Sequence, residues 1–268
     1  MKATRAIALS FALIGLVACA ESDVTPPQDG HWSGVLADVR VQWSAAEGID
    51  LTTGPAVAVR AYLESYNLVQ LSGSFAKAYD GFESAVPENE PPDDVANPAA
   101  FDRRPTTDVP VSAPLSGNIK FRVQSESVAP DTANVVVCSF TYGLGEKQGD
   151  GQYESVATGG PLDSRGIAGI RLDLEPPADA PPIEQPQAGA ALSPASNVFG
   201  GWKIVGRLDS KSAGQEWPEA EAVQKACIAE APDPLPIRNN LLQGPRPLEG
   251  NFEGNSPAPG WPEAPSNK

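Results

Sequence analysis

The stretch from Ile119 to Phe140 reads IKFRVQSESVAPDTANVVVCSF and decides the fold class. Its first part alternates apolar and polar residues at Ile119, Phe121 and Val123, as a strand with one buried face does. A turn signal follows at Pro130-Asp131, and a second apolar run resumes from Val135 to Phe140. We therefore predict two neighbouring antiparallel strands in this stretch.

Further elements are predicted on both sides of this pair. Thr52-Thr53-Gly54-Pro55 is a good helix start, and apolar residues at helical spacing follow it as far as Tyr66. A second aromatic helix is expected from Phe75 to Val86, and a short one from Glu219 to Ala229. Alternating residues predict other strands at 39–43, 153–157, 167–175 and 202–208. This order predicts an α+β fold with N-terminal helices packed on a curved, cone-like antiparallel sheet.

Proline divides the chain of 268 residues into segments, because 28 prolines and 25 glycines are unevenly spread along it. Two insertions, 87–117 and 176–200, contain seven and six prolines and show no periodicity. The last part, 231–268, is expected to be a flexible tail. We therefore predict one α+β domain over residues 35–230, interrupted by these two insertions.

The charge and residue counts exclude several functions. With 34 acidic and 19 basic residues the net charge is -15, which opposes binding to nucleic acids. One histidine and three cysteines cannot form a His/Cys metal cluster, and we predict neither a metal site nor a cofactor. His31 is expected to be exposed in a tether, and a catalytic residue is not expected anywhere.

The N-terminus has the features of an export signal. Lys2 and Arg5 precede the uncharged run Ala6 to Ala18, which is too short to cross a bilayer. Leu16-Val17-Ala18-Cys19 resembles the lipobox of bacterial lipoproteins. The resemblance implies that residues 1–18 are a signal peptide and that Cys19 carries lipid. Residues 19–34 then form a tether, and the protein is held on the extracytoplasmic face of the bacterial cell membrane.

The two remaining cysteines form the simplest pair for an exported protein. With Cys19 assigned to lipid, we predict a disulfide between Cys138 and Cys227, and two free buried thiols are the alternative. Such a bond would join a central strand to a late helix.

The element order resembles the nuclear transport factor two-like, or SnoaL-like, cone fold. The resemblance rests on the helices at 54–64 and 75–82 and on the strands at 131–138 and 201–205. It implies a pocket between sheet and helices for a small apolar or amphipathic ligand, although the same aromatic residues could instead fill the core. The expected pocket residues are Tyr62, Tyr66, Phe75, Tyr79, Phe82 and Trp202.

Three functions follow from these observations. The first is a lipid-anchored, non-catalytic binding or accessory protein of the cell envelope, with an envelope protein or a small apolar ligand as partner. The second is an isomerase- or hydratase-like enzyme, for which the resemblance suggests Tyr62, Tyr79, Asp80 and Asp173 as reacting groups. The third is a surface spacer, encoded by a bacterium or a phage, that acts through its acidic, proline-rich segments.

Overall fold

The computed structural model describes residues 30–91, 97–178, 185–214 and 216–264. Cys19 and the predicted signal peptide lie outside these residues. So does most of the predicted tether.

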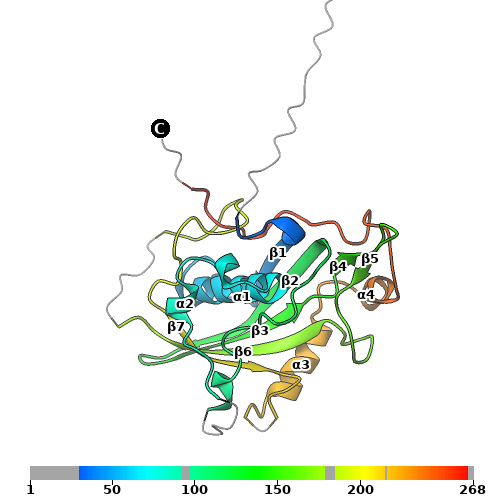
Figure 1. Cartoon of the computed structure of the whole chain (residues 1–268). Helices are drawn as coiled ribbons and strands as arrows, with labels where there is room; N and C mark the ends of the chain where they lie inside the picture. The colour runs from blue at the N-terminus through cyan, green and yellow to red at the C-terminus, as the bar shows by residue number, and fades with distance from the viewer. Residues whose placement is uncertain (1–29, 92–96, 179–184, 215, 265–268) are drawn as a thin grey trace, which may run out of the picture.

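The predicted α+β fold with a strongly curled sheet is confirmed (Figure 1). The strand order is β5-β4-β2-β3-β6-β7, and all of these neighbours are antiparallel. A further strand, β1, pairs with β2 in parallel. The strands are β1 (Asp38–Ala45), β2 (Leu115–Val128), β3 (Ala133–Phe140), β4 (Leu144–Lys147), β5 (Tyr153–Ser155), β6 (Ile167–Glu175) and β7 (Lys203–Asp209).

The alternation in β2 gives the sheet two different faces. Ile119, Phe121 and Val123 are buried in the main core, whereas Lys120 and Arg122 point to the opposite face and are partly exposed. Figure 1 shows the long helix α1 on one face of the sheet and α3 on the other. The helices are α1 (Gly54–Ser72), α2 (Phe82–Ala85), α3 (Ala220–Ala229) and α4 (Leu235–Leu242).

Helix α1 begins where the sequence indicates. Thr53 occupies the N-cap position, and Pro55 lies in the first turn. Gly73 ends the helix with a φ of 69°, a left-handed conformation that glycine adopts without steric cost. Most of α1 is buried, including Arg60 and Glu64.

The second aromatic helix is much shorter than predicted. A single 3-10 turn covers Phe75–Lys77, and α2 has only four residues. Gly81 separates the two with a φ of 89°, and a Cβ at this position would lie only 2.4 Å from the side chain of Asn197. This break, which follows extended backbone at Ala78, explains why the aromatic spacing does not produce one continuous helix.

The insertions are also more ordered than their composition suggests. In the first, Arg103 is buried and donates hydrogen bonds to the carbonyls of Glu88 and Val205. In the second, Val198 and Phe199 are buried in the main core. The prediction of unpacked insertions is therefore wrong for these residues, because a few isolated side chains anchor them without any periodic pattern.

The prediction of a flexible tail is wrong for residues 232–264. This segment contains α4, and Phe252 and Trp261 are fully buried at 0% and 1% exposure. Gln42 of β1 forms a bridge with Ala258, and the backbone N–H of Trp43 donates to the Ala258 carbonyl at 2.6 Å. The segment runs past β1 in Figure 1, and the domain therefore extends beyond its predicted limit at residue 230.

The start of the described chain is also packed into the domain. Trp32 is 2% exposed, although it lies within the predicted tether. His31 is partly buried rather than fully exposed, and its ring contacts Tyr79 edge-on at 5.1 Å. The tether prediction is therefore wrong from His31 onward, because the rings of His31 and Trp32 pack against the domain.

The predicted disulfide between Cys138 and Cys227 is confirmed. It joins β3 to α3 and lies within a second hydrophobic cluster that includes Phe140 and Ile167. This cluster occupies the sheet face opposite α1. Helix α3 is therefore covalently attached to the centre of the sheet, and α4 follows it as a further helix.

Candidate ligand-binding site

The six aromatic residues expected around a pocket pack mainly against one another. The rings of Tyr62 and Phe82 are stacked at 6.0 Å, and Tyr66 meets Tyr62 edge-on at 5.9 Å. Phe75 and Trp202 are partly buried and pack against the same core. The structure thus shows these residues largely as core, which is the alternative that the sequence leaves open.

A buried carboxylate lies at the centre of α1. Glu64 is 2% exposed, and its Oε1 accepts a hydrogen bond from Nε1 of Trp43 at 2.7 Å. Its Oε2 accepts from the Tyr79 hydroxyl at 2.7 Å and from Nε1 of Trp261 at 2.8 Å. The Tyr79 oxygen in turn accepts from Nε1 of Trp32 at 2.8 Å. We call these five residues the Glu64 cluster.

Arg60 lies one helical turn before Glu64 and binds the chain segments that surround it. Its guanidinium lies 4.2 Å from the centre of the Trp261 ring. It donates hydrogen bonds to the backbone carbonyls of Leu51, Gln187, Pro259 and Gly260. One arginine therefore ties α1 to the loop just before it and to two distant segments of backbone.

The Glu64 cluster is enclosed by protein. Burial raises the pKa of Glu64, and this effect exceeds the opposing influence of Arg60 and of the three hydrogen bonds. A reacting carboxylate needs contact with a substrate, but every hydrogen bond of Glu64 goes to a core side chain. The cluster consequently acts as a structural centre.

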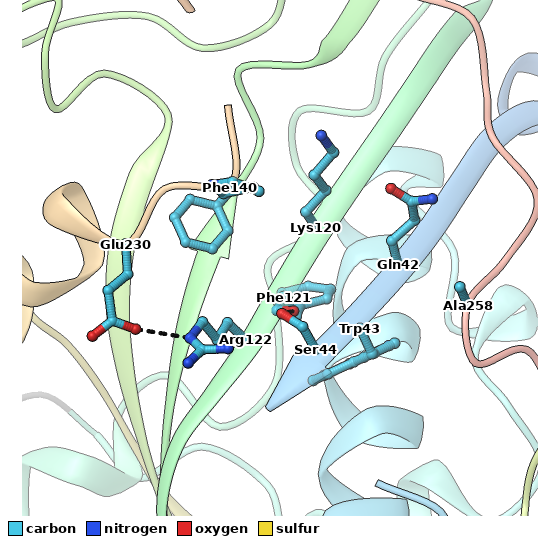
Figure 2. A pocket seen from close by; sticks show the side chains of 10 residues that line it. Gln42, Trp43, Ser44, Lys120, Phe121, Arg122, Phe140, Glu230 and Ala258 are labelled. Carbon is cyan, nitrogen blue, oxygen red and sulfur yellow. Dashed lines mark hydrogen bonds and ion pairs between the residues drawn. The ribbon is translucent and has the colours of Figure 1, made fainter. Parts of the chain in front are cut away.

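A hollow of about 640 Å³ lies near the edge of the sheet where β1 and β2 run in parallel (Figure 2). We call it the sheet hollow. Figure 2 shows Phe140, Arg122 and Glu230 on one side of it and Gln42 and Ala258 on the other. It is lined by Gln42, Trp43, Ser44, Lys120, Phe121, Arg122, Phe140, Glu230, Pro232 and Ala258.

Pro232 and Ala258, both exposed, supply apolar side-chain surface to the sheet hollow, whereas its aromatic residues are buried. Trp43 and Phe121 are stacked with their centroids 4.5 Å apart. Nε1 of Trp43 is bonded to Glu64, so the Glu64 cluster fixes the orientation of this ring. Phe140 belongs to the disulfide-containing cluster of the second face and is 2% exposed. These buried rings therefore pack into the cores on the two faces of the sheet and hold in place the strands that carry Gln42, Ser44, Lys120 and Arg122.

The charged groups of the sheet hollow form pairs. Nε of Arg122 lies 2.8 Å from Oε2 of Glu230, and Nζ of Lys120 lies 2.8 Å from Oδ2 of Asp233. Hydrogen bonds from Gln124 and Arg122 lower the pKa of Glu230, which keeps its carboxylate ionised. The wall thus has polar groups with little net charge, an arrangement suited to a mostly apolar ligand with one polar group.

The sequence signals for the sheet hollow were present but incomplete. The alternation at 39–43 predicts the strand that carries Trp43, and the alternation from Ile119 places Lys120 and Arg122 on one face. Glu230, Pro232 and Ala258 form the third wall. Pro232 and Ala258 belong to the segment predicted as a flexible tail, and Glu230 is the last residue of the predicted domain. Nothing in the local sequence pattern indicates that this segment returns to β1.

The residues considered for catalysis are not brought together. The Tyr79 hydroxyl binds Glu64, and the Tyr62 hydroxyl donates to the carbonyl of Arg103. Asp173 pairs with Arg171 on its own strand, and Asp80 is exposed. Their observed hydrogen bonds therefore support packing and surface roles for these four residues.

Within the described residues, three or more His, Cys, Asp or Glu side chains nowhere gather in a way that could hold a metal ion. The same part of the chain contains no helix with the length and apolar character needed to span a membrane. Comparison of the chain with protein-family models, curated proteins and solved structures finds no match. The cone-fold family and the lipobox therefore stay predictions from the sequence.

Proposed function

We propose that this chain is a lipid-anchored, extracytoplasmic binding protein of the bacterial cell envelope. The sheet hollow is its ligand site. The observation that carries this proposal is the hollow itself, in which exposed apolar side chains lie beside paired charges. Its size falls within the range of roughly 300–1,000 Å³ that is usual for small-molecule sites.

The lining favours a small, mostly apolar molecule with one polar group. Pro232 and Ala258 offer apolar surface, whereas Gln42 and Ser44 offer hydrogen-bonding groups. A free anion would have to compete with Glu230 for Arg122, because this ion pair is already formed at 2.8 Å. An uncharged amphipathic molecule avoids this competition and still buries its apolar part.

Anchoring is tested by the change Cys19→Ala. Two or more acyl chains give stable membrane attachment, and the acidic mature chain is repelled by anionic headgroups. We expect the variant to move from the membrane to the soluble fraction, measured by fractionation and immunoblotting. Ser127→Ala serves as the control, because it changes an exposed residue of the folded domain. A Cys19→Ala protein that still sediments with membranes would contradict the anchor.

Ligand binding in the sheet hollow is tested by filling it. In Ser44→Trp an indole ring occupies the hollow, whereas Ser127→Trp places the same ring on an exposed part of β2. The full chain is purified from its own membranes in mild detergent, and co-purifying small molecules are measured by native mass spectrometry. We expect Ser44→Trp to reduce the occupancy about tenfold or more, in line with the loss of one buried apolar contact area.

The control must retain the ligand. If Ser127→Trp and the unaltered chain carry the same small molecule and Ser44→Trp does not, the sheet hollow is the site. Equal occupancy in all three proteins would place the ligand elsewhere, and no bound molecule in any of them would contradict a small-molecule binding function.

A further inference from the structure

A second concavity, which we call the polar cleft, lies on the α1 face of the sheet. It has a volume of about 470 Å³ and is formed by the second half of α1, the ends of β3 and β7 and the start of β6. Ser139 lies in it, and its register partner Phe121 belongs to the core beneath α1. The polar cleft and Arg122 of the sheet hollow are therefore on opposite faces of the sheet.

Three side chains form a fixed polar unit in the wall of this cleft. The Tyr66 hydroxyl donates to Oδ1 of Asp102 at 2.8 Å, and Nη1 of Arg207 donates to Oδ2 of the same carboxylate. The Arg207 guanidinium also lies over the Tyr66 ring, 4.5 Å from its centre. Each group is thus held by the other two, which preorganises them for a ligand.

Within this unit, Arg207 is mostly buried, whereas the carboxylate of Asp102 is accessible. The Arg207 side chain is 10% exposed, and its Nε has no hydrogen-bond acceptor among the described residues. The Asp102 side chain is 54% exposed, so a ligand can reach its oxygens. Burial raises the pKa of Tyr66, which keeps the phenol neutral and able to donate.

The remaining lining is polar but balanced in charge. Asp102 and Asp209 are matched by Arg207 and Lys211. Hydroxyl and amide groups complete most of the wall, and a small apolar strip runs between them. The hydroxyl and amide residues are Asn67, Gln70, Ser139, Thr141 and Ser212, and the apolar ones include Leu63, Ala168 and Ile170.

We infer that the polar cleft binds an uncharged, hydroxyl-rich small molecule, of the size of a mono- or disaccharide. Such a molecule donates and accepts hydrogen bonds at many positions, as this wall requires, and one apolar ring face suits the strip at Ile170. A purely apolar ligand would leave the polar groups without partners. A charged ligand would disturb the balance between the two acids and two bases. This inference does not depend on the sheet hollow.

The test uses glucose and N-acetylglucosamine as neutral probes and glucuronate as the charged counterpart. Binding to the full chain is measured by saturation-transfer NMR and by isothermal titration. Asp102→Asn keeps the shape of the side chain but removes its charge, and Asp80→Asn makes the same change at an exposed position outside the cleft. Gln70→Trp fills the cleft from an exposed position of α1.

We expect a saturable interaction with at least one neutral sugar and weaker binding of glucuronate. Asp102→Asn should weaken sugar binding about tenfold or more, as expected for a hydrogen bond to a charged group. Gln70→Trp should abolish it, and Asp80→Asn should leave it unchanged, while these two variants keep the melting temperature of the unaltered chain within a few degrees. The inference is overturned by no saturable binding of either neutral sugar, by binding that survives both cleft variants, or by a preference for glucuronate.

Discussion

Replacing Glu64 by alanine is expected to lower the free energy of unfolding by roughly 3–5 kcal/mol. The change leaves the indole N–H groups of Trp43 and Trp261 without their acceptor in the core, and the Tyr79 hydroxyl keeps its weaker bond to the Leu192 carbonyl at 3.2 Å. It also separates Arg60 from the negative charge one turn away. Guanidinium-induced unfolding, followed by tryptophan fluorescence, measures the effect.

The control for this prediction is Glu221→Ala on α3, because the Glu221 side chain is 82% exposed and pairs only with Lys225 on the same helix. Its effect should stay within about 0.5 kcal/mol. A loss of less than 1 kcal/mol for Glu64→Ala would show that the Glu64 cluster contributes little to stability.

Glu64→Gln separates the charge of the group from its shape. Burial raises the folded-state pKa of Glu64 above its usual value of 4.5, so the folded chain holds the proton more tightly than the unfolded chain. Protonation of Glu64 therefore contributes to the stability of the folded state. This contribution is fully present at pH values below the pKa of Glu64 in the unfolded chain, and it is lost as pH rises through its pKa in the folded chain. The stability of the unaltered chain relative to Glu64→Gln should therefore fall as pH rises from about 4.5. A difference that does not vary with pH would contradict the raised pKa.

Removing the disulfide is the second change with a large expected effect. The bond joins residues separated by 89 positions, and closing a loop of this length is worth roughly 4–5 kcal/mol in the chain-entropy description. The double variant Cys138→Ala, Cys227→Ala should lose about this amount in the same unfolding experiment. Alanine is used because both positions are completely buried.

Reductant provides the matched control for the disulfide. Added to the unaltered chain under partly unfolding conditions, it should lower the midpoint toward that of the double variant. Added to the double variant, it should change nothing. A double variant as stable as the unaltered chain would show that packing between β3 and α3 is sufficient without the bond.

The sequence predicts elements best where burial is periodic and local. The alternation at Ile119 to Val123 yields β2, and Thr53 and Pro55 correctly mark the start of α1. The Cys138–Cys227 pairing follows because only two cysteines remain once Cys19 is assigned. In each case the deciding signal lies within a few residues or comes from simple counting.

The failures come from contacts between residues far apart in the chain. Trp261 looks like one apolar residue in a proline-rich segment, yet its ring is buried against Arg60 and its indole N–H reaches Glu64. Gly81 is visible in the sequence, but its left-handed conformation, fitted against Asn197, cannot be inferred from aromatic spacing. The composition of a segment predicts whether it is polar or apolar on average, but it does not show that a single side chain, such as that of Trp261, packs into the core.

The same limit applies to the candidate sites. The sheet hollow needs Ala258 beside Gln42, a bridge across more than two hundred residues. In the polar cleft, Asp102 comes from a proline-rich insertion and Arg207 from the last strand. Of the six aromatic residues predicted to surround a pocket, Tyr66 alone lines the polar cleft.

The hydrogen bond between Trp261 and Glu64 spans 197 positions of the chain, and that between Arg60 and Gly260 spans 200. Contacts of such long range slow folding, because the intervening chain must be ordered before they form. A chain that emerges from synthesis or export in order from its N-terminus presents α1 long before Trp261. Until residue 261 arrives, the Glu64 cluster lacks one of its indole donors, and we expect the domain to remain incompletely folded up to that point. The last tryptophan thereby sets the time at which the domain completes its core.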